Sequence, residues 1–177
     1  MRTSIRPDEL ARLGRLTEEH FVCELGAGHL LLADELPIAL ELPRPVRAMH
    51  PAAHGTSHWS VDLERYFAGE RVSFSLDVAA YGAVHGFTAF ELAVYEALAQ
   101  VPYGEAVSYR DLAVAAGRPN AYRAVGSAMA RNALPVILPC HRVVRNDGRL
   151  GEYGDDPAWK ERLLLLEGVS VVDGRLA

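Results

Sequence analysis

The side chain best suited to nucleophilic chemistry lies in the apolar stretch L-P-C-H-R-V-V, residues 138–144. Cys140 follows a proline and precedes His141, so a sulfur nucleophile stands beside a titratable imidazole. A free thiol has a pKa of about 8.5, and an apolar site lowers its thiolate fraction further, so reaction at neutral pH requires a base. We expect His141 to reach the sulfur directly or through one water.

Two residues distant in sequence are candidates to orient this pair. Glu167 ends an expected helix, where the macrodipole disfavours a carboxylate by a few tenths to about 1 kcal/mol. A partner such as His141 would explain this placement, and the alternative is an exposed glutamate. Asn132 is a candidate to brace the turn around Cys140 through its amide, although an ordinary asparagine at a helix C-terminus is the alternative.

Capping signals predict the helices that position these residues. Thr88 and Glu91 form a capping box before a helix that ends ahead of Pro102. Ser108 caps a second helix that ends at Gly117, and a third helix spans residues 121–131. A last helix runs from Pro157, after the cap Asp156, to Glu167. Residues 135–139 are predicted to form a buried extended segment that leads to Cys140 and fixes its position. The N-D-G turn at 146–148 predicts a hairpin with arms at 143–144 and 150.

The N-terminal part is rich in strand signals. Strands are predicted around residues 20–25, 29–33 and 38–42, with a turn at 26–28 and a short helix at 62–69. The fold class is therefore α/β (α+β). We expect a small strand-rich N-terminal domain, residues 1–80, followed by a mainly helical, winged helix-turn-helix-like C-terminal domain, residues 81–177.

Positive charge is concentrated near Cys140, although the chain has a net charge of −5. The window 118–149 holds six arginines, at 118, 123, 131, 142, 145 and 149, against the single acid Asp147. Part of this window is the second helix of a helix-turn-helix pattern. A basic strip on an acidic protein is what local phosphate binding needs, whereas a merely solvated face is the alternative.

Composition narrows the class of protein. Half the residues are apolar, which suffices for a sizeable core, and no apolar run approaches the roughly 20 residues that span a bilayer. Two distant cysteines make no disulfide framework, so we expect a cytoplasmic location. His50, His54 and His58 have a metal-like spacing, but Gly55 weakens the helix they would need, and we expect no metal site.

The segments R-A-V-G-S-A-M-A-R-N, P-V-I-L-P-C-H-R-V-V and P-Y-G-E-A-V-S-Y resemble the O6-alkylguanine-DNA alkyltransferases, also called methylated-DNA–protein-cysteine methyltransferases. The resemblance extends from about Asp62 to Gly168. It implies DNA repair by stoichiometric, self-inactivating transfer of an alkyl group from O6-alkylguanine in double-stranded DNA, with base flipping and with no cofactor. A monomer is implied; acceptance of O4-alkylthymine and cooperative binding to DNA stay open.

The resemblance also assigns roles to residues. Cys140 is the alkyl acceptor, His141 its base through a water, Glu167 the group that orients His141, and Asn132 the brace of the turn. Tyr109 lies against the flipped guanine and protonates its N3.

Further residues are implied to contact DNA or the extruded base. Arg123 fills the space that the base leaves in the duplex, Met129 packs against the base, and the Cys140 and Val143 carbonyls read its exocyclic amine. The backbone at Tyr153 and Gly154 contacts O6. Ser108 and Arg142 complete the predicted DNA-binding set.

The chain departs from the family pattern at several places. Asn132 is followed by Ala133 where the family usually has proline, so the turn loses one rigid φ. Asp155 and Asp156 replace a small pair beside the expected alkyl pocket. Glu91 and Tyr95 replace a glutamine and a tryptophan. Cys23, His20 and His29 resemble part of the zinc site of some relatives, but no fourth ligand is identifiable.

Two other classes of protein remain as alternatives. An alkyltransferase-like module would bind the lesion without chemistry, but such modules replace the acceptor cysteine, and Cys140 is present. A thiol hydrolase or peroxidase would also use Cys140 and His141, and multiple turnovers on a small ester or peroxide would distinguish it.

Overall fold

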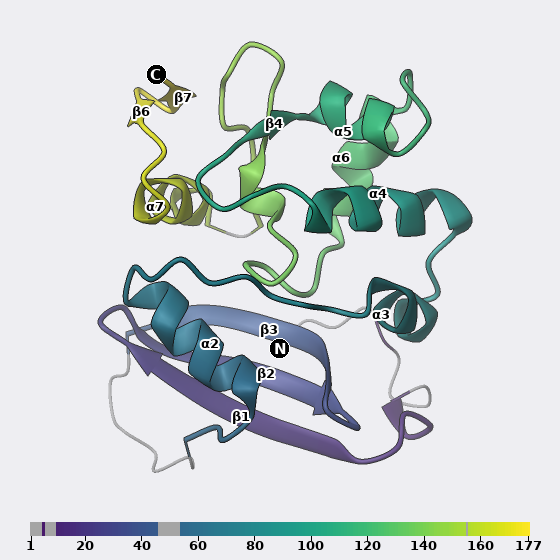
Figure 1. The fold of residues 1–177 in the computed structure, drawn as a ribbon, viewed down its shortest axis with the longest axis vertical. Coiled ribbons are helices and arrows are strands. Elements are labelled where there is room, and N and C mark those ends of the chain that lie inside the picture. The colour runs from purple at the N-terminus through teal and green to yellow at the C-terminus, as the bar shows by residue number, and fades with distance from the viewer. Residues whose placement is uncertain (1–4, 6–9, 46–53, 155) are drawn as a thin grey trace. The chain divides into compact units, whose positions relative to one another are not determined.

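The computed structural model describes residues 5, 10–45, 54–154 and 156–177 (Figure 1). The predicted mixed α/β class is confirmed, with strands early in the chain and mainly helices later. The chain forms two compact units, of which the first runs to Gly86 and includes Ala133–Pro135. The second unit contains residues 87–132 and 136–177.

The first unit contains an antiparallel sheet in the order β1-β2-β3, formed by Leu16–Cys23, Gly26–Ala33 and Leu36–Arg44. The turn between β1 and β2 occupies residues 24–25, so the predicted turn at 26–28 is wrong. Gly28 belongs to β2, and the ring of Phe21 fills the space that a Cβ at Gly28 would need. This glycine therefore serves close packing within the sheet.

Among the described residues, the first unit includes the helices α2 (His58–Phe67) and α3 (Val78–His85). α2 lies across the sheet, where Phe67 stacks on Phe21 with ring centroids 5.6 Å apart (Figure 1). It begins before the predicted residue 62 because Ser57 caps it by accepting a hydrogen bond from the Ser60 backbone N–H. α3 was not predicted, although Asp77 caps its start and Gly86 ends it in the left-handed conformation.

The second unit contains the helix-turn-helix pattern. α4 (Ala89–Ala99) begins with the predicted Thr88–Glu91 capping box, and α5 (Tyr109–Ala115) is capped by Ser108. α6 (Tyr122–Ala130) follows the turn after Gly117 and is tied to α4 by the Tyr95 hydroxyl, which donates to the Ala128 carbonyl at 2.6 Å. These three helices position the residues that precede the loop leading to Cys140.

Short strands connect helices α5 and α6 to the rest of the second unit. The predicted N-D-G turn at residues 146–148 forms, with the Arg145 N–H donating to the Arg149 carbonyl at 2.9 Å. The predicted arms do not pair with each other, because β5 (Val143–Val144) pairs in parallel with β4 (Val107–Ser108). Leu150 instead donates its N–H to Gly174, close to the hairpin of β6 (Val171–Val172) and β7 (Arg175–Leu176). α7 (Ala158–Leu166) begins after Asp156, whose carboxylate accepts from the Ala158 N–H. No helix in the described ranges has both the length and the apolar character of a membrane span.

Candidate active site

Cys140 opens a single 3-10 turn, Cys140–Arg142, rather than ending an extended segment. Its thiol is buried, 3.0 Å from the amide nitrogen of Asn132 and 3.7 Å from the hydroxyl of Tyr153. Burial raises the pKa of Cys140, while the hydrogen bonds with Asn132 and Tyr153 and the charge of Lys160 act in the opposite direction. The sulfur is therefore protonated at rest, but donors that stabilise a thiolate already surround it.

The loop before Cys140 is held in a strained conformation. Val136 has φ of 74°, a left-handed value that costs a β-branched residue about 1–3 kcal/mol. The Asn132 amide donates to the Leu138 carbonyl at 2.8 Å as well as to the sulfur, so one side chain spans the end of this loop. Such strain persists only where surrounding contacts hold the loop, and the Asn132 amide supplies two of these contacts beside Cys140.

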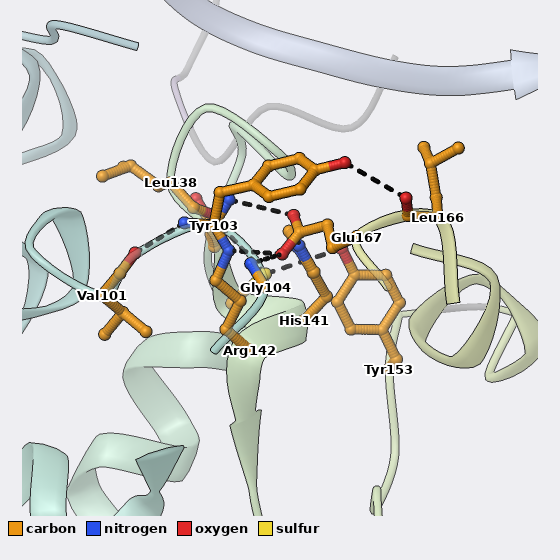
Figure 2. Close-up of polar contacts among 11 residues, drawn as sticks. Val101, Tyr103, Gly104, Leu138, His141, Arg142, Tyr153, Leu166 and Glu167 are labelled. Carbon is orange, nitrogen blue, oxygen red and sulfur yellow. Dashed lines mark hydrogen bonds and ion pairs between the residues drawn. The ribbon is translucent and has the colours of Figure 1, made fainter. Parts of the chain in front are cut away.

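The Glu167 carboxylate is the centre of a buried polar network (Figure 2). His141 Nε2 lies 2.7 Å from Glu167 Oε1, and the Arg142 guanidinium donates to both carboxylate oxygens at 2.9 Å. The backbone N–H of Gly104 donates a fourth hydrogen bond at 3.1 Å. Burial alone would raise the pKa of Glu167, but the donors from His141 and Arg142 lower it to about 2.

This network sets the protonation state of His141. Burial lowers the pKa of His141, against the opposing effect of Glu167, so the ring is neutral at neutral pH. With the Nε2 hydrogen directed to the carboxylate, the lone pair belongs to Nδ1. His141 is therefore in the form that accepts a proton, and the ionised Glu167 favours the imidazolium that results.

Tyr109 and Lys160 form a second cluster next to Cys140. The Lys160 ammonium lies 5.6 Å from the centroid of the Tyr109 ring, and Lys160 is only 1% exposed. Burial lowers the pKa of Lys160 to about 8, and the charge of Cys140 opposes this effect. Burial raises the pKa of Tyr109, as does Cys140, whereas the charge of Arg145 lowers it. A lysine that is buried without a carboxylate among its described contacts is a candidate functional group.

Sequence reasoning did not select Lys160, although a signal was available. It is the only lysine in the chain, and it shares the inward face of α7 with Leu163, Leu164 and Glu167. Spacings of three, four and seven residues define one face of a helix, and a charge on that face is unusual.

The residues predicted to meet DNA occupy different environments. Arg123 is exposed on α6, while Met129 on the same helix is 9% exposed. The Ser108 hydroxyl is engaged in capping α5, through Asp111. Val143 is buried, and its N–H donates to the Cys140 carbonyl, an oxygen that can still accept a second hydrogen bond. Their proposed contacts with DNA or base stay predictions.

Arg142 was predicted to bind DNA, but its side chain is buried and bonded within the protein. Its guanidinium donates to Glu167 and to the Val101 carbonyl at 2.6 Å, and only 6% of the residue is exposed (Figure 2). A side chain committed to a buried carboxylate has no donor directed to a phosphate outside. Arg131, also in the basic window, forms an ion pair with Glu91. The exposed arginines of the window are those at 118, 123, 131, 145 and 149, of which Arg149 also forms an ion pair, with Asp147.

The segment after the active-site turn carries the last predicted contacts. Tyr153 is half-buried and directs its hydroxyl to the Cys140 sulfur, and Gly154 is exposed with φ of 48°. Asp155 lies outside the described residues, and the exposed Asp156 accepts the Ala158 N–H at the start of α7. His50 also lies outside the described residues. Among those described, no group of three or more histidine, cysteine or acidic side chains is arranged to hold a metal ion.

Comparison with known proteins links this site to one family. Residues 89–169 match the family model described as the 6-O-methylguanine DNA methyltransferase DNA binding domain. A Mycobacterium leprae methylated-DNA–protein-cysteine methyltransferase is 37% identical over 142 residues, which is 80% of this chain and 83% of the relative. A Methanosarcina barkeri protein of the same name is 47% identical over 105 residues, 59% of this chain but only 63% of the relative, which is less than two thirds of its length.

A solved structure agrees with these sequence matches. The chain is similar to Mycobacterium tuberculosis OGT in complex with DNA, with a TM-score of 0.69 and 31% sequence identity. The similarity covers 85% of this chain and 92% of the other. The similarity therefore extends over most of the length of both chains.

Proposed function

Because the chain belongs to the family of methylated-DNA–protein-cysteine methyltransferases, we propose that it repairs DNA by moving an alkyl group from O6 of guanine to the sulfur of Cys140. The observation that carries this proposal is the buried thiol, held by Asn132, next to the neutral His141 on its ionised Glu167. We assign DNA binding and alkyl acceptance to the predicted C-terminal domain, residues 81–177. All the catalytic residues fall within the matched range 89–169, which supports this assignment.

The proposed reaction begins with a proton transfer. The thiol proton moves through one water to Nδ1 of His141, and Glu167 stabilises the imidazolium. The Asn132 amide, the Tyr153 hydroxyl and the Lys160 ammonium then stabilise the thiolate. Each of these groups opposes the effect of burial on the pKa of Cys140, so the thiolate becomes accessible without exposure to water.

Alkyl transfer follows as an in-line displacement. The sulfur lone pair forms a bond to the alkyl carbon, the bond from that carbon to O6 breaks, and the electrons remain on guanine. Tyr109 gives a proton to N3 of the leaving guanine as its negative charge develops. The charge of Arg145 favours the Tyr109 phenolate, against the effects of burial and of Cys140 on its pKa, and the Lys160 ammonium lies 5.6 Å from the centroid of its ring. The product thioether is not opened by thiol exchange, so each chain acts once.

Access to the base requires its removal from the duplex. Extrusion of a damaged base costs a few kcal/mol, and an inserted side chain offsets part of that cost. The exposed Arg123 on α6 is the proposed insertion residue, and Met129, Val143, Tyr153 and Gly154 the proposed base contacts. The complex of the M. tuberculosis relative with DNA supports DNA as the partner.

Mass spectrometry tests the proposal directly. The protein is incubated with duplex DNA that carries O6-methylguanine, and its mass is then measured, with Cys140→Ala as the control. We expect a gain of one methyl group that maps to Cys140 and is absent in the control. An unmodified protein that still binds the lesion would contradict alkyl transfer and would support a lesion-binding module instead.

A further inference from the structure

We infer that Tyr81 is a positioning residue for Cys140, acting through the peptide bond that joins Asn132 to Ala133. The inference rests on the proposed function, in which Cys140 is the acceptor and Asn132 holds it. Ala133 departs from the proline that the family pattern leads one to expect, and the structure shows what its backbone N–H does. It donates to the Tyr81 hydroxyl at 3.2 Å.

Both polar groups of Ala133 are held within the first unit. The Ala133 carbonyl accepts the N–H of Leu40 at 2.8 Å, in addition to the bond from its own N–H to Tyr81. Ala133 also packs against the apolar cluster that contains Ile38 and Ala39. A proline at this position would have no N–H and would fix φ covalently. Hydrogen bonds to neighbouring elements replace that covalent restraint here.

Tyr81 is itself rigidly placed. It is fully buried on α3, and its ring lies 4.3 Å from that of His85 one turn later. His85 Nε2 lies 3.0 Å from the Ile38 carbonyl on β3. β3 is an edge strand, and residues 38 and 40 direct their backbone polar groups to the same side. The edge of β3 therefore supports both His85, which packs on Tyr81, and Ala133 directly.

The geometry of the peptide bond carries this restraint to the thiol. The N–H of Ala133 and the Cα of Asn132 belong to one planar peptide unit, so fixing the direction of the N–H limits ψ of Asn132. The Asn132 amide must in turn meet both the Leu138 carbonyl at 2.8 Å and the Cys140 sulfur at 3.0 Å. Because the loop between them includes the strained Val136, it does not fix Asn132 by itself. The hydroxyl of Tyr81 thus determines how well the amide meets the sulfur.

The test measures the thiol without DNA. In a Cys23→Ser background Cys140 is the only thiol, and its rate of alkylation by iodoacetamide is followed as a function of pH. We expect Tyr81→Phe to raise the apparent pKa of Cys140 and to slow its alkylation at pH 7 about three- to tenfold. Asn132→Ala is expected to act in the same direction and at least as strongly.

A double-mutant cycle separates positioning from loss of stability. If Tyr81 acts through Asn132, Tyr81→Phe has no further effect on the thiol in the Asn132→Ala background. Tyr66→Phe, which changes an equally buried tyrosine on α2, controls for destabilisation of the first unit and leaves the thiol pKa unchanged. An unchanged Cys140 profile in Tyr81→Phe, or additive effects in the double variant, would overturn the role of Tyr81.

This outcome is independent of the proposed function. If the thiol responds as expected but Cys140 takes no methyl group from DNA, the proposed function fails and the role of Tyr81 holds. If Cys140 is methylated but does not respond to Tyr81→Phe, the reverse is true.

Discussion

Replacing the buried Lys160 is expected to stabilise the folded protein and, at the same time, to raise the pKa of the Cys140 thiol. Lys160→Met keeps the length and apolar stem of the side chain but removes the ammonium. In the folded protein Lys160 is 1% exposed, and its ammonium lies beside Tyr109 and near Cys140. The substitution therefore tests whether a desolvated charge is retained at the cost of stability.

The size of the effect follows from the pKa of Lys160. Its decrease from 10.5 to about 8, at 1.36 kcal/mol per unit, corresponds to about 3 kcal/mol of destabilisation by the charged form. Because the folded-state pKa is the lower one, the full cost applies below pH 8. It decreases between pH 8 and 10.5 and is absent above. Lys160→Met is thus expected to be more stable at pH 7 by up to about 3 kcal/mol.

Urea denaturation at a series of pH values measures this difference. We expect the two stability curves to converge as the pH approaches 10.5, and the thiol pKa of Cys140 to be higher in Lys160→Met. Arg162→Met, on the exposed side of α7, controls for a general effect of removing a cation and changes stability by less than about 0.5 kcal/mol. A less stable Lys160→Met at pH 7, or a difference that does not depend on pH, would refute the desolvation of Lys160.

Three further outcomes are expected. Glu167→Gln leaves the buried Arg142 charge without its partner, so it lowers the free energy of unfolding at pH 7 by about 3–5 kcal/mol in urea denaturation, and it slows alkyl transfer. The carboxylate stabilises the fold above pH 4.5 and loses this effect as the pH falls towards about 2, so an acid titration in which native protein and variant lose stability in parallel would contradict the low pKa of Glu167. Arg123→Ala slows repair of duplex DNA more than reaction with the free alkylated base, since only the duplex requires extrusion, and equal losses in the two rate assays would exclude insertion by Arg123. Duplex binding weakens steeply with salt in a titration from 50 to 200 mM because the exposed arginines contact phosphate, whereas a flat dependence would place DNA elsewhere.

Local signals predicted much of the second unit. The Thr88–Glu91 capping box and the Ser108 cap fixed the starts of α4 and α5, because these hydrogen bonds form within four residues of chain. The macrodipole at the end of α7 indicated that Glu167 needed a partner, and His141 is within hydrogen-bond distance of it. Such inferences depend on neighbours in sequence or on a simple electrostatic conflict.

Non-local packing accounts for what the sequence did not reveal. The basic window placed Arg142 on a DNA surface, but a distant carboxylate and the Val101 carbonyl bury its guanidinium. The parallel pairing of two-residue strands β4 and β5 has no period that a sequence pattern could show. Lys160 was not selected from the sequence, because its burial depends on the elements that pack against α7. In each case the deciding partner lies far away along the chain.

The stoichiometry of transfer tests the central claim most directly. A fixed amount of protein is mixed with an excess of duplex DNA that carries labelled O6-methylguanine, and the methyl groups bound to protein and released from DNA are counted over time. We predict that both stop at one per chain, with all the label on the Cys140 peptide. Repeated turnover beyond one methyl group per chain, or loss of the methyl group from DNA with none on Cys140, would contradict a single-use acceptor thiol.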